Sequence, residues 1–223
     1  MKVTFVRHGA TAAAGTPRLI GRTDLPLSEL GHRQATALGE RLADRDFTAL
    51  WASPLLRCRV TAAQIGDRIG HMAVLDPRLA EMDLGDLEGL SLAELPKGPG
   101  TFRDRWQKRP GTTRFPGGEN LNEVAARVWA LLNELYAEHP DGHVLVVSHM
   151  FAISATLTRI FQWKPTHFRT FAIDVASLTT VSFQHGGFRL LQLNDCAHLE
   201  AVAPSPTLTP AALPARSVNK RPA

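Results

Sequence analysis

The chain has 223 residues, 44% of them hydrophobic, which fits one ordinary domain with a full core and leaves room for a small insertion. No stretch approaches the roughly 18 apolar residues that span a bilayer, so we expect no membrane partner. No charged-then-apolar leader precedes the first strand, and Cys58 and Cys196 form no disulfide or metal pattern. We therefore expect a cytoplasmic protein with reduced thiols. The formal net charge is +4, but three basic residues in the acid-free segment 201–223 supply most of it, so no nucleic-acid partner is expected.

Apolar runs and helical spacing alternate along the first half of the chain. Ser28 opens one predicted helix, and Ser53 with Pro54 opens another, with the serine as N-cap and the proline in the first turn. The predicted elements are, in chain order, a strand at 2–6, a helix at 28–43, a strand at 50–52, a helix from 53 and an apolar run at 73–75.

The second half begins with a stretch from Gly85 to Gly118 that is rich in glycine, proline and charge, with short helical pieces near Leu92 and Phe102. We interpret this stretch as an excursion that covers the functional site expected at the sheet edge, rather than as a second domain. Asn120 and Glu123 have the spacing of a capping box. The remaining predicted elements are a helix at 120–138, a strand at 144–147, a helix at 151–161, and strands at 177–183 and 188–193 joined by a hairpin at Gly186-Gly187.

Alternating strands and helices predict a mainly parallel sheet covered on both faces, that is, an α/β fold with a single three-layer α/β/α domain over residues 1–198. The closing hairpin adds antiparallel pairing at an edge. Residues 199–223 are rich in proline and alanine and lack periodicity, so we expect a disordered tail.

Two predicted strands end in histidine. Arg7 and His8 follow the first strand, and His149 follows the strand at 144–147. Ligands of open α/β sheets bind outside the carboxyl ends of the strands, and two imidazoles with a guanidinium group suit a tetrahedral oxyanion such as phosphate. The alternatives are a solvated turn for Arg7-His8 and a hydrogen-bonded core histidine for His149.

Arg57 falls in the first turn of the helix that follows the 50–52 strand, where a helix N-terminus already favours anions. Arg59 lies on another face and is expected at the surface.

An acidic run, Glu81 to Gly89, follows the apolar run at 73–75. Transfer of a phosphoryl group from an alcohol needs a proton for the leaving oxygen, and Glu81 is the first carboxyl group after the strand end. The histidines lack the spacing of metal ligands, so no metal site is expected.

Together these residues resemble the histidine phosphatase superfamily, in its phosphoglycerate-mutase-like branch. The resemblance extends from about Lys2 to His198. The motifs that carry it are Arg7-His8-Gly9-x-Thr11, Ser53-Pro54-Leu55-x-Arg57, Glu81-x-x-x-Gly85-x-x-Glu88-Gly89, Pro116-Gly117-Gly118-Glu119 and Val146-Val147-Ser148-His149.

The resemblance implies that His8 is a nucleophile that forms a phosphohistidine, and that Arg7, Arg57 and His149 surround the phosphoryl oxygens. It adds Thr11 and Gly21 as phosphate-binding positions. It further implies that Glu81 protonates the leaving group and then activates water, with no metal or cofactor. Glu81 would need a raised pKa for this role.

Within the family, mutases carry a different acidic motif and a long insertion with a lysine and paired arginines, which this chain lacks, so a hydrolase is favoured. The segments Gly21 to Ser28 and Glu81 to Asp86 are similar to those of alpha-ribazole phosphatases, and also occur in broad-specificity members. Two positions depart from the family: the asparagine that often follows Thr11 is replaced by Ala12-Ala13-Ala14, and Ile20 stands where mutases have Ser or Thr.

We therefore expect a metal-independent phosphomonoesterase acting on a small phosphorylated metabolite, with alpha-ribazole 5'-phosphate as one candidate. A phosphoglycerate-type mutase and a catalytically silent phospholigand-binding module are the alternatives. The expected partner is a small phosphate ester, and a homodimer is left open. Specificity is expected in the 12–25 loop and in the excursion, at Arg103, Arg105 or Trp106.

Overall fold

The computed structural model describes residues 1–91, 93–184 and 187–202. Within them, six strands form one sheet in the order β3-β2-β4-β1-β5-β6. The strands are β1 (Lys2–Arg7), β2 (Ala49–Ala52), β3 (Val74–Leu75), β4 (His143–Ser148), β5 (Leu178–Gln184) and β6 (Gly187–Asp195). Three parts of the prediction fall on residues outside the described ranges. They are the tail beyond Val202, Leu92 of the first short helical piece, and Gly186 of the hairpin turn.

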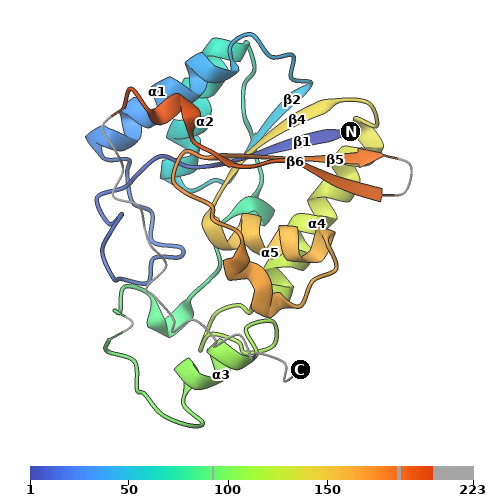
Figure 1. The fold of residues 1–223 in the computed structure, drawn as a ribbon. Coiled ribbons are helices and arrows are strands. Elements are labelled where there is room, and N and C mark those ends of the chain that lie inside the picture. Colours follow the sequence, from blue (N-terminus) through green and yellow to red (C-terminus); the bar gives the residue numbers. More distant parts are fainter. Residues whose placement is uncertain (92, 185–186, 203–223) are drawn as a thin grey trace, which may run out of the picture.

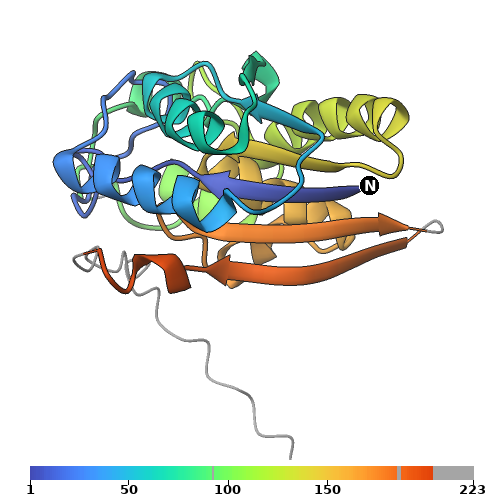
Figure 2. The ribbon, with the colours of Figure 1, turned by 90° about the horizontal axis from the view of Figure 1, so that it is seen from above.

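The sheet is mainly parallel, as predicted. β4 lies between β1 and β2 and runs parallel to both, and β3 pairs parallel with β2. β5 runs antiparallel to β1 and carries β6 at the edge, so the final hairpin supplies the antiparallel part of the sheet. Figure 2 shows β5 pointing against its neighbours. The carboxyl ends of β1 and β4 therefore lie side by side.

Helices cover both faces of the sheet, which confirms the three-layer fold. Helices α1 (Glu29–Leu42) and α2 (Leu56–Ile69) lie on one face, and α4 (Leu121–Glu138) and α5 (Met150–Ile160) lie on the other (Figure 1). Side chains alternate between the faces along β1, so that Phe5 packs with the α4–α5 layer and Val6 with the α1–α2 layer. The N-caps of α1 and α4 are Ser28 and Asn120, the latter in the predicted capping box.

The start of α2 differs from the prediction. The helix begins at Leu56 with Leu55 as N-cap, and Ser53 lies outside it. The Ser53 hydroxyl accepts a hydrogen bond from the ring of His149 instead, at 2.7 Å. The backbone N–H of Leu56, at the helix start, donates to the side chain of Asp24 at 2.5 Å. A carboxylate from a distant loop therefore caps α2, which local sequence cannot reveal.

Two glycines let the β1–α1 loop approach the first turn of α1. A Cβ atom on Gly31 would lie 2.0 Å from the carbonyl oxygen of Ala10, and one on Gly9 would lie 2.5 Å from the carbonyl oxygen of Gly31. The Ala10 carbonyl cannot move away easily because the Ser28 N–H and hydroxyl both donate to it, at 2.9 and 3.1 Å. This contact fixes the loop that begins with His8.

We expect Gly31→Ala to lower the free energy of unfolding by about 1–3 kcal/mol, since the added methyl group overpacks this contact. Helix propensity alone favours alanine by about 1 kcal/mol, so the sign of the change is diagnostic. Urea unfolding measures it, with Arg33→Ala on the exposed face of α1 as the control. A stabilised Gly31→Ala variant would contradict the close approach.

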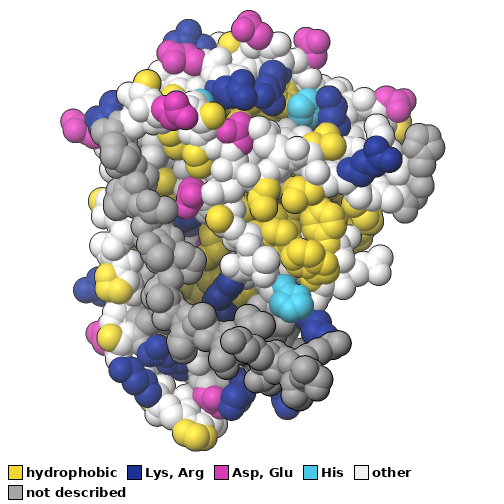
Figure 3. Space-filling view, viewed as in Figure 1, with side chains coloured by type: hydrophobic (Ala, Val, Ile, Leu, Met, Phe, Trp, Pro, Cys, Tyr) yellow, Lys and Arg dark blue, Asp and Glu magenta, His cyan; other side chains and the backbone are white. Residues whose placement is uncertain are grey.

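The sheet edge formed by β6 carries exposed leucines. Leu191 is 54% exposed, and Leu190 and Leu193 are 37% and 39% exposed. Hydrophobic side chains gather on the same side of the molecule in Figure 3.

In the part of the chain that the structure describes, no helix combines the length and apolar character of a membrane span.

Candidate functional site

The ends of β1 and β4 bring the two predicted histidines together. Arg7 pairs with Ser148 in the strand register, and His8 and His149 are the next residues along each strand. The backbone N–H of His8 donates to the Ser148 carbonyl at 3.1 Å. The two imidazole rings are 5.0 Å apart between centroids, at an interplanar angle of 62°. Residues separated by 141 positions in the sequence therefore form one compact centre.

The His8 ring is held in one tautomer. Its Nδ1 lies 2.8 Å from the carbonyl oxygen of Gly9, which can only accept, so Nδ1 carries the proton and Nε2 presents a lone pair. The ring is 7% exposed. Burial holds the pKa of His8 well below its usual value, and the charges of Arg57 and Arg7 lower this pKa further. His8 is therefore a neutral imidazole whose unprotonated Nε2 has the lone pair that a nucleophile needs.

Arg57 connects the two rings. It is 2% exposed and is the second residue of α2, as predicted, whereas Arg59 is exposed. The Nε–H of Arg57 lies 3.2 Å from His8 Nε2 and 3.3 Å from His149 Nδ1. Its Nη1 and Nη2 donate to the carbonyls of Thr23 and Gly21, at 2.8 and 2.7 Å. All three nitrogens of the guanidinium group are thus engaged.

The resemblance suggested two other phosphate-binding positions, Gly21 and Thr11. The Gly21 carbonyl accepts a hydrogen bond from Arg57, and the Gly21 N–H donates to Glu88. Thr11 is buried and forms an isolated bridge with Leu27. Gly21 therefore acts on the histidine pair through Arg57, and Thr11 acts on the backbone pairing of its own loop.

Arg7 contributes an unpaired donor beside His8. Its Nη1 donates to the carbonyl of Ile173 at 2.6 Å, while its Nε is buried and lacks a hydrogen-bond partner within the described residues. Burial lowers the pKa of Arg7, but a guanidinium group stays charged in proteins. A buried, charged N–H without a partner is costly, and an anion at this position would satisfy it.

His149 is fully buried, and its orientation follows from its partners. Because Arg57 Nε can only donate, His149 Nδ1 accepts, and Nε2 carries the proton that it donates to Ser53. Cys58 Sγ lies 3.3 Å from the same Nε2. Burial lowers the pKa of His149 well below its usual value, with His8 and Arg57 adding to the effect.

Glu81 lies in the predicted acidic run and is 5% exposed. Its carboxylate accepts from the backbone N–H of Met82 at 2.9 Å and from that of Phe151, in the first turn of α5, at 3.3 Å. Burial raises the pKa of Glu81 above its usual value, and these hydrogen bonds and the charges of Arg57 and Arg7 oppose the shift only in part. Glu81 can therefore hold a proton at higher pH than an exposed glutamate.

The backbone that carries Glu81 is fixed by two side chains of the α4–α5 layer and the sheet. Arg127 donates to the carbonyls of Arg78, Ala80 and Glu81, at 2.6, 2.7 and 3.1 Å. The Ser148 hydroxyl donates to the carbonyl of Leu79 at 2.7 Å. Sequence reasoning missed Arg127, because an arginine on an amphipathic helix usually faces solvent.

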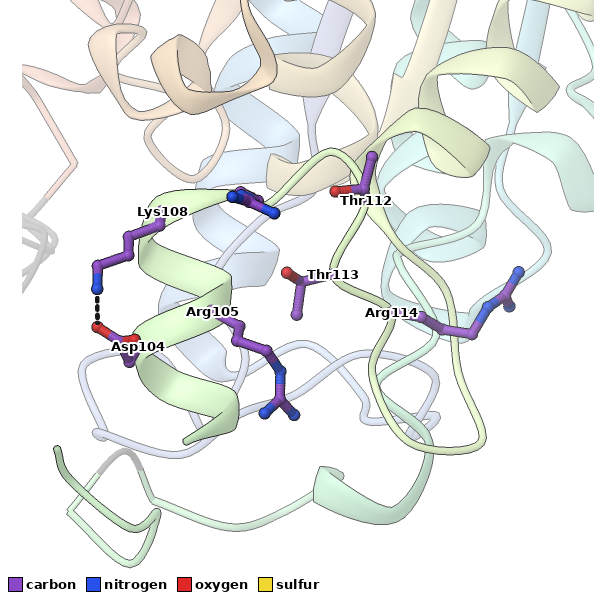
Figure 4. Close-up of a pocket in the computed structure, with 7 residues that line it drawn as sticks. Asp104, Arg105, Lys108, Thr112, Thr113 and Arg114 are labelled. Atoms are coloured by element: carbon purple, nitrogen blue, oxygen red, sulfur yellow. Dashed lines mark ion pairs between the residues drawn. The ribbon is translucent and has the colours of Figure 1, made fainter. Parts of the chain in front are cut away.

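A separate pocket of about 450 Å³ lies between α3 (Phe102–Lys108) and the following loop (Figure 4). Its lining is mainly basic and hydroxylic and consists of Asp104, Arg105, Lys108, Arg109, Thr112, Thr113 and Arg114. Trp106, a predicted specificity residue, is 6% exposed and packs against Phe115 at 4.8 Å between ring centroids. Its size and apolar ring place it in the core, so it is not a pocket residue. Arg105 lines the pocket, and Arg103 is half-buried on α3.

Metal-ligating side chains do not gather in the described part of the chain: no group of three or more His, Cys, Asp or Glu residues there is arranged to hold an ion. The positive charge of the centre comes from Arg7 and Arg57.

Comparison with known proteins places the chain in one family. The model of the histidine phosphatase superfamily (branch 1) matches residues 3–196. The chain is 31% identical over 208 residues to the probable phosphoglycerate mutase GpmB of Erwinia tasmaniensis, covering 91% of this chain and 97% of that protein. It is also 31% identical over 200 residues to phosphoserine phosphatase 1 of Hydrogenobacter thermophilus, covering 89% and 94%.

A solved structure supports the same assignment. A mycobacterial glucosyl-3-phosphoglycerate phosphatase in complex with inorganic phosphate superposes with a TM-score of 0.77 at 31% identity, covering 88% of this chain and 98% of that one. The chain therefore belongs to branch 1 of the histidine phosphatase superfamily, as a phosphatase or mutase that acts on small phosphorylated metabolites.

Proposed function

We propose that the protein is a metal-independent phosphomonoesterase that hydrolyses a small phosphorylated metabolite through a phosphohistidine at His8. The observation that carries the proposal is the state of His8, whose Nδ1 is protonated against the Gly9 carbonyl and whose Nε2 lies 3.2 Å from a buried guanidinium nitrogen. A neutral nitrogen nucleophile next to a fixed positive charge is what attack on a phosphate ester requires.

In the first step, His8 Nε2 attacks phosphorus and the ester P–O bond breaks. Glu81 gives its proton to the leaving oxygen, which departs as an alcohol, and remains as a carboxylate. Arg57 and the unpaired Nε–H of Arg7 donate to the phosphoryl oxygens. The negative charge of the bound phosphoryl group favours the protonated form of His149, whose Nδ1–H then becomes a further donor.

In the second step, the Glu81 carboxylate takes a proton from water as the water oxygen attacks phosphorus. The N–P bond breaks, its electron pair returns to His8 Nε2, and inorganic phosphate leaves. Both His8 and Glu81 are then in their starting protonation states. The two guanidinium groups supply the positive charge that metal ions supply in kinases.

Hydrolysis rather than isomerisation is supported by the short connection after Glu81, which lacks the long insertion with a lysine and paired arginines that mutases of this family use to hold the acid. The substrate class has two candidates. The likeness of Gly21 to Ser28 and Glu81 to Asp86 to alpha-ribazole phosphatases favours alpha-ribazole 5'-phosphate. The similarity to phosphoserine phosphatase 1 and to a glucosyl-3-phosphoglycerate phosphatase favours a phosphate ester with a second negative group, such as phosphoserine or a phosphoglycerate.

The test is a panel of phosphate esters that includes alpha-ribazole 5'-phosphate, phosphoserine, 3-phosphoglycerate and a generic aryl phosphate. Released phosphate and isomerised phosphoglycerate are measured separately, with and without chelator. We expect phosphate release that the chelator does not change. Isomerisation without phosphate release would assign a mutase, no turnover of any ester would assign a binding module, and inhibition by chelator would overturn the metal-independent scheme.

A further inference from the structure

The loop at 21–23 holds Arg57 through its carbonyls, and it is itself held by one carboxylate. We propose that Glu88 is a positioning residue that fixes this loop and thereby fixes Arg57 against His8. The proposal rests on the proposed function, because its first measure is turnover. It assigns a role to the second glutamate of the acidic run, whose carboxylate bonds the 21–23 loop and not the His8 centre.

The Glu88 carboxylate receives four hydrogen bonds from this loop. Oε1 accepts from the backbone N–H groups of Gly21 and Thr23, at 2.8 and 3.1 Å, and from the Thr23 hydroxyl at 2.6 Å. Oε2 accepts from the backbone N–H of Arg22 at 3.2 Å. A carboxylate oxygen has about two lone-pair positions, so the loop fills the accepting capacity of Oε1 and takes one position of Oε2. Three successive N–H groups around one anion form a nest.

The other side of the same loop faces Arg57. Its Gly21 and Thr23 carbonyls accept from Nη2 and Nη1 of Arg57, at 2.7 and 2.8 Å, as described above. The N–H groups of these two residues thus bind Glu88 while their C=O groups bind the guanidinium. Asp24, the next residue, accepts from the backbone N–H of Leu56 at the start of α2. The loop therefore orients the guanidinium plane of Arg57 and also holds the N-terminus of α2, the helix that carries Arg57.

Backbone contacts outside the 21–23 loop also place Glu88. Its N–H donates to the Gly85 carbonyl at 3.1 Å in a 3₁₀ turn, Gly85–Leu87. Next to it, Gly89 N–H donates to the Leu19 carbonyl and Leu19 N–H donates to the Leu90 carbonyl, both at 2.8 Å. This short pairing carries Glu88 to the loop, whereas the loop itself exposes Arg22 and Thr23 and buries little apolar surface.

Glu88→Gln is the sharpest test because it keeps the shape of the side chain but replaces one accepting oxygen by a donor that meets an N–H group. We expect kcat/KM for the best ester of the panel to fall about 10- to 100-fold, as expected for a misplacement of a charge-stabilising group by a fraction of an ångström to 1 Å. Glu94→Gln is the matched control, since the Glu94 carboxylate accepts from the N–H of Ser91 and not from the 21–23 loop.

A double-mutant cycle separates positioning of Arg57 from a general loss of structure. If Glu88 acts through Arg57, Glu88→Gln changes kcat/KM less than about 2-fold in an Arg57→Ala background. An equal loss in both backgrounds, or a Glu88→Gln variant as active as Glu94→Gln, would overturn the proposal. Thr23→Val, which removes only the 2.6 Å hydroxyl contact, should show the same pattern with a smaller effect and serves if Glu88→Gln fails to fold.

Binding of inorganic phosphate, measured by calorimetry, gives a second readout that does not need turnover. The dissociation constant should rise in Glu88→Gln and stay unchanged in Glu94→Gln. Absence of turnover in the unmodified protein would count against the proposed function alone. Turnover and phosphate affinity that are both insensitive to Glu88→Gln would count against the positioning role alone.

Discussion

Replacing Glu81 by glutamine should lower kcat for an alkyl phosphate by about 10²- to 10⁴-fold, the usual contribution of a positioned general acid. Glutamine keeps the size of the side chain. Its single oxygen can still accept from the N–H of Met82, which leaves the longer hydrogen bond from the N–H of Phe151 unmade. It has no proton to give to the leaving oxygen. An alkoxide leaving group depends on that proton far more than a nitrophenolate does.

The same variant should therefore respond differently to an aryl phosphate. The first step proceeds without the acid, but the second step lacks its base, so we expect a burst of phenolate equal to the enzyme concentration followed by slow turnover. Rapid-mixing measurements at 400 nm check this. Asp86→Asn, an exposed carboxyl group of the same run, is the control and should behave like the unmodified protein. Equal losses on both substrates without a burst would contradict the role of Glu81.

The pH dependence gives an independent check on the same group. The first step needs protonated Glu81, whose pKa is raised by burial, so kcat/KM should fall as pH rises through that pKa. His8 stays neutral to well below pH 6.5 because burial lowers its pKa, so it causes no loss on the acidic side near that pH. The decrease in kcat/KM that is due to Glu81 should be absent from the pH profile of Glu81→Gln. Ionisation of the substrate phosphate changes kcat/KM in both proteins alike, so the difference between the two pH profiles reports on Glu81.

Arg57→Ala should lower kcat/KM by at least about 10²-fold, the cost of removing one donor aimed at developing negative charge. The side chain is buried and contacts both histidines, so its removal also leaves the Gly21 and Thr23 carbonyls without their partner. Steady-state kinetics on the best ester measure the loss, and thermal unfolding monitors the fold.

The matched control is Arg59→Ala, an exposed arginine two residues along the same helix, which should change kcat/KM less than about 2-fold. Arg57→Lys keeps the charge but cannot span His8, Gly21 and Thr23 with one planar fork, so we expect it to recover only part of the activity. An Arg57→Ala variant as active as Arg59→Ala would rule out the guanidinium as a charge-stabilising group.

Much of the fold could be predicted because its elements show local signals. β4 contains an uninterrupted apolar run at 144–147, and β1 contains apolar residues broken only by Thr4 over 3–6, as expected for strands buried on both faces. Ser28 and Asn120 mark the starts of their helices as caps. The convergence of Arg7, His8 and His149 followed from a topological rule, since parallel neighbours end at the same edge.

The parts of the site that were missed depend on contacts between distant segments. Ser53 has the features of an N-cap in the sequence, yet its hydroxyl orients the His149 ring. The Ile173 carbonyl that holds Arg7 lies outside the sheet, and no side-chain pattern reveals a backbone oxygen. Arg127 and Glu88 act on backbone groups of other loops, so their roles emerge only once those loops are placed in space.

The central claim is that His8 carries the phosphoryl group between the two steps. The most direct measurement is brief incubation with a phosphate ester labelled in the phosphoryl group, followed by denaturation and mapping of the labelled peptide. A label on His8 that is acid-labile and base-stable, and that is absent from His8→Ala, is the expected result. Turnover without any such label, or a label that persists in His8→Ala, would contradict the account.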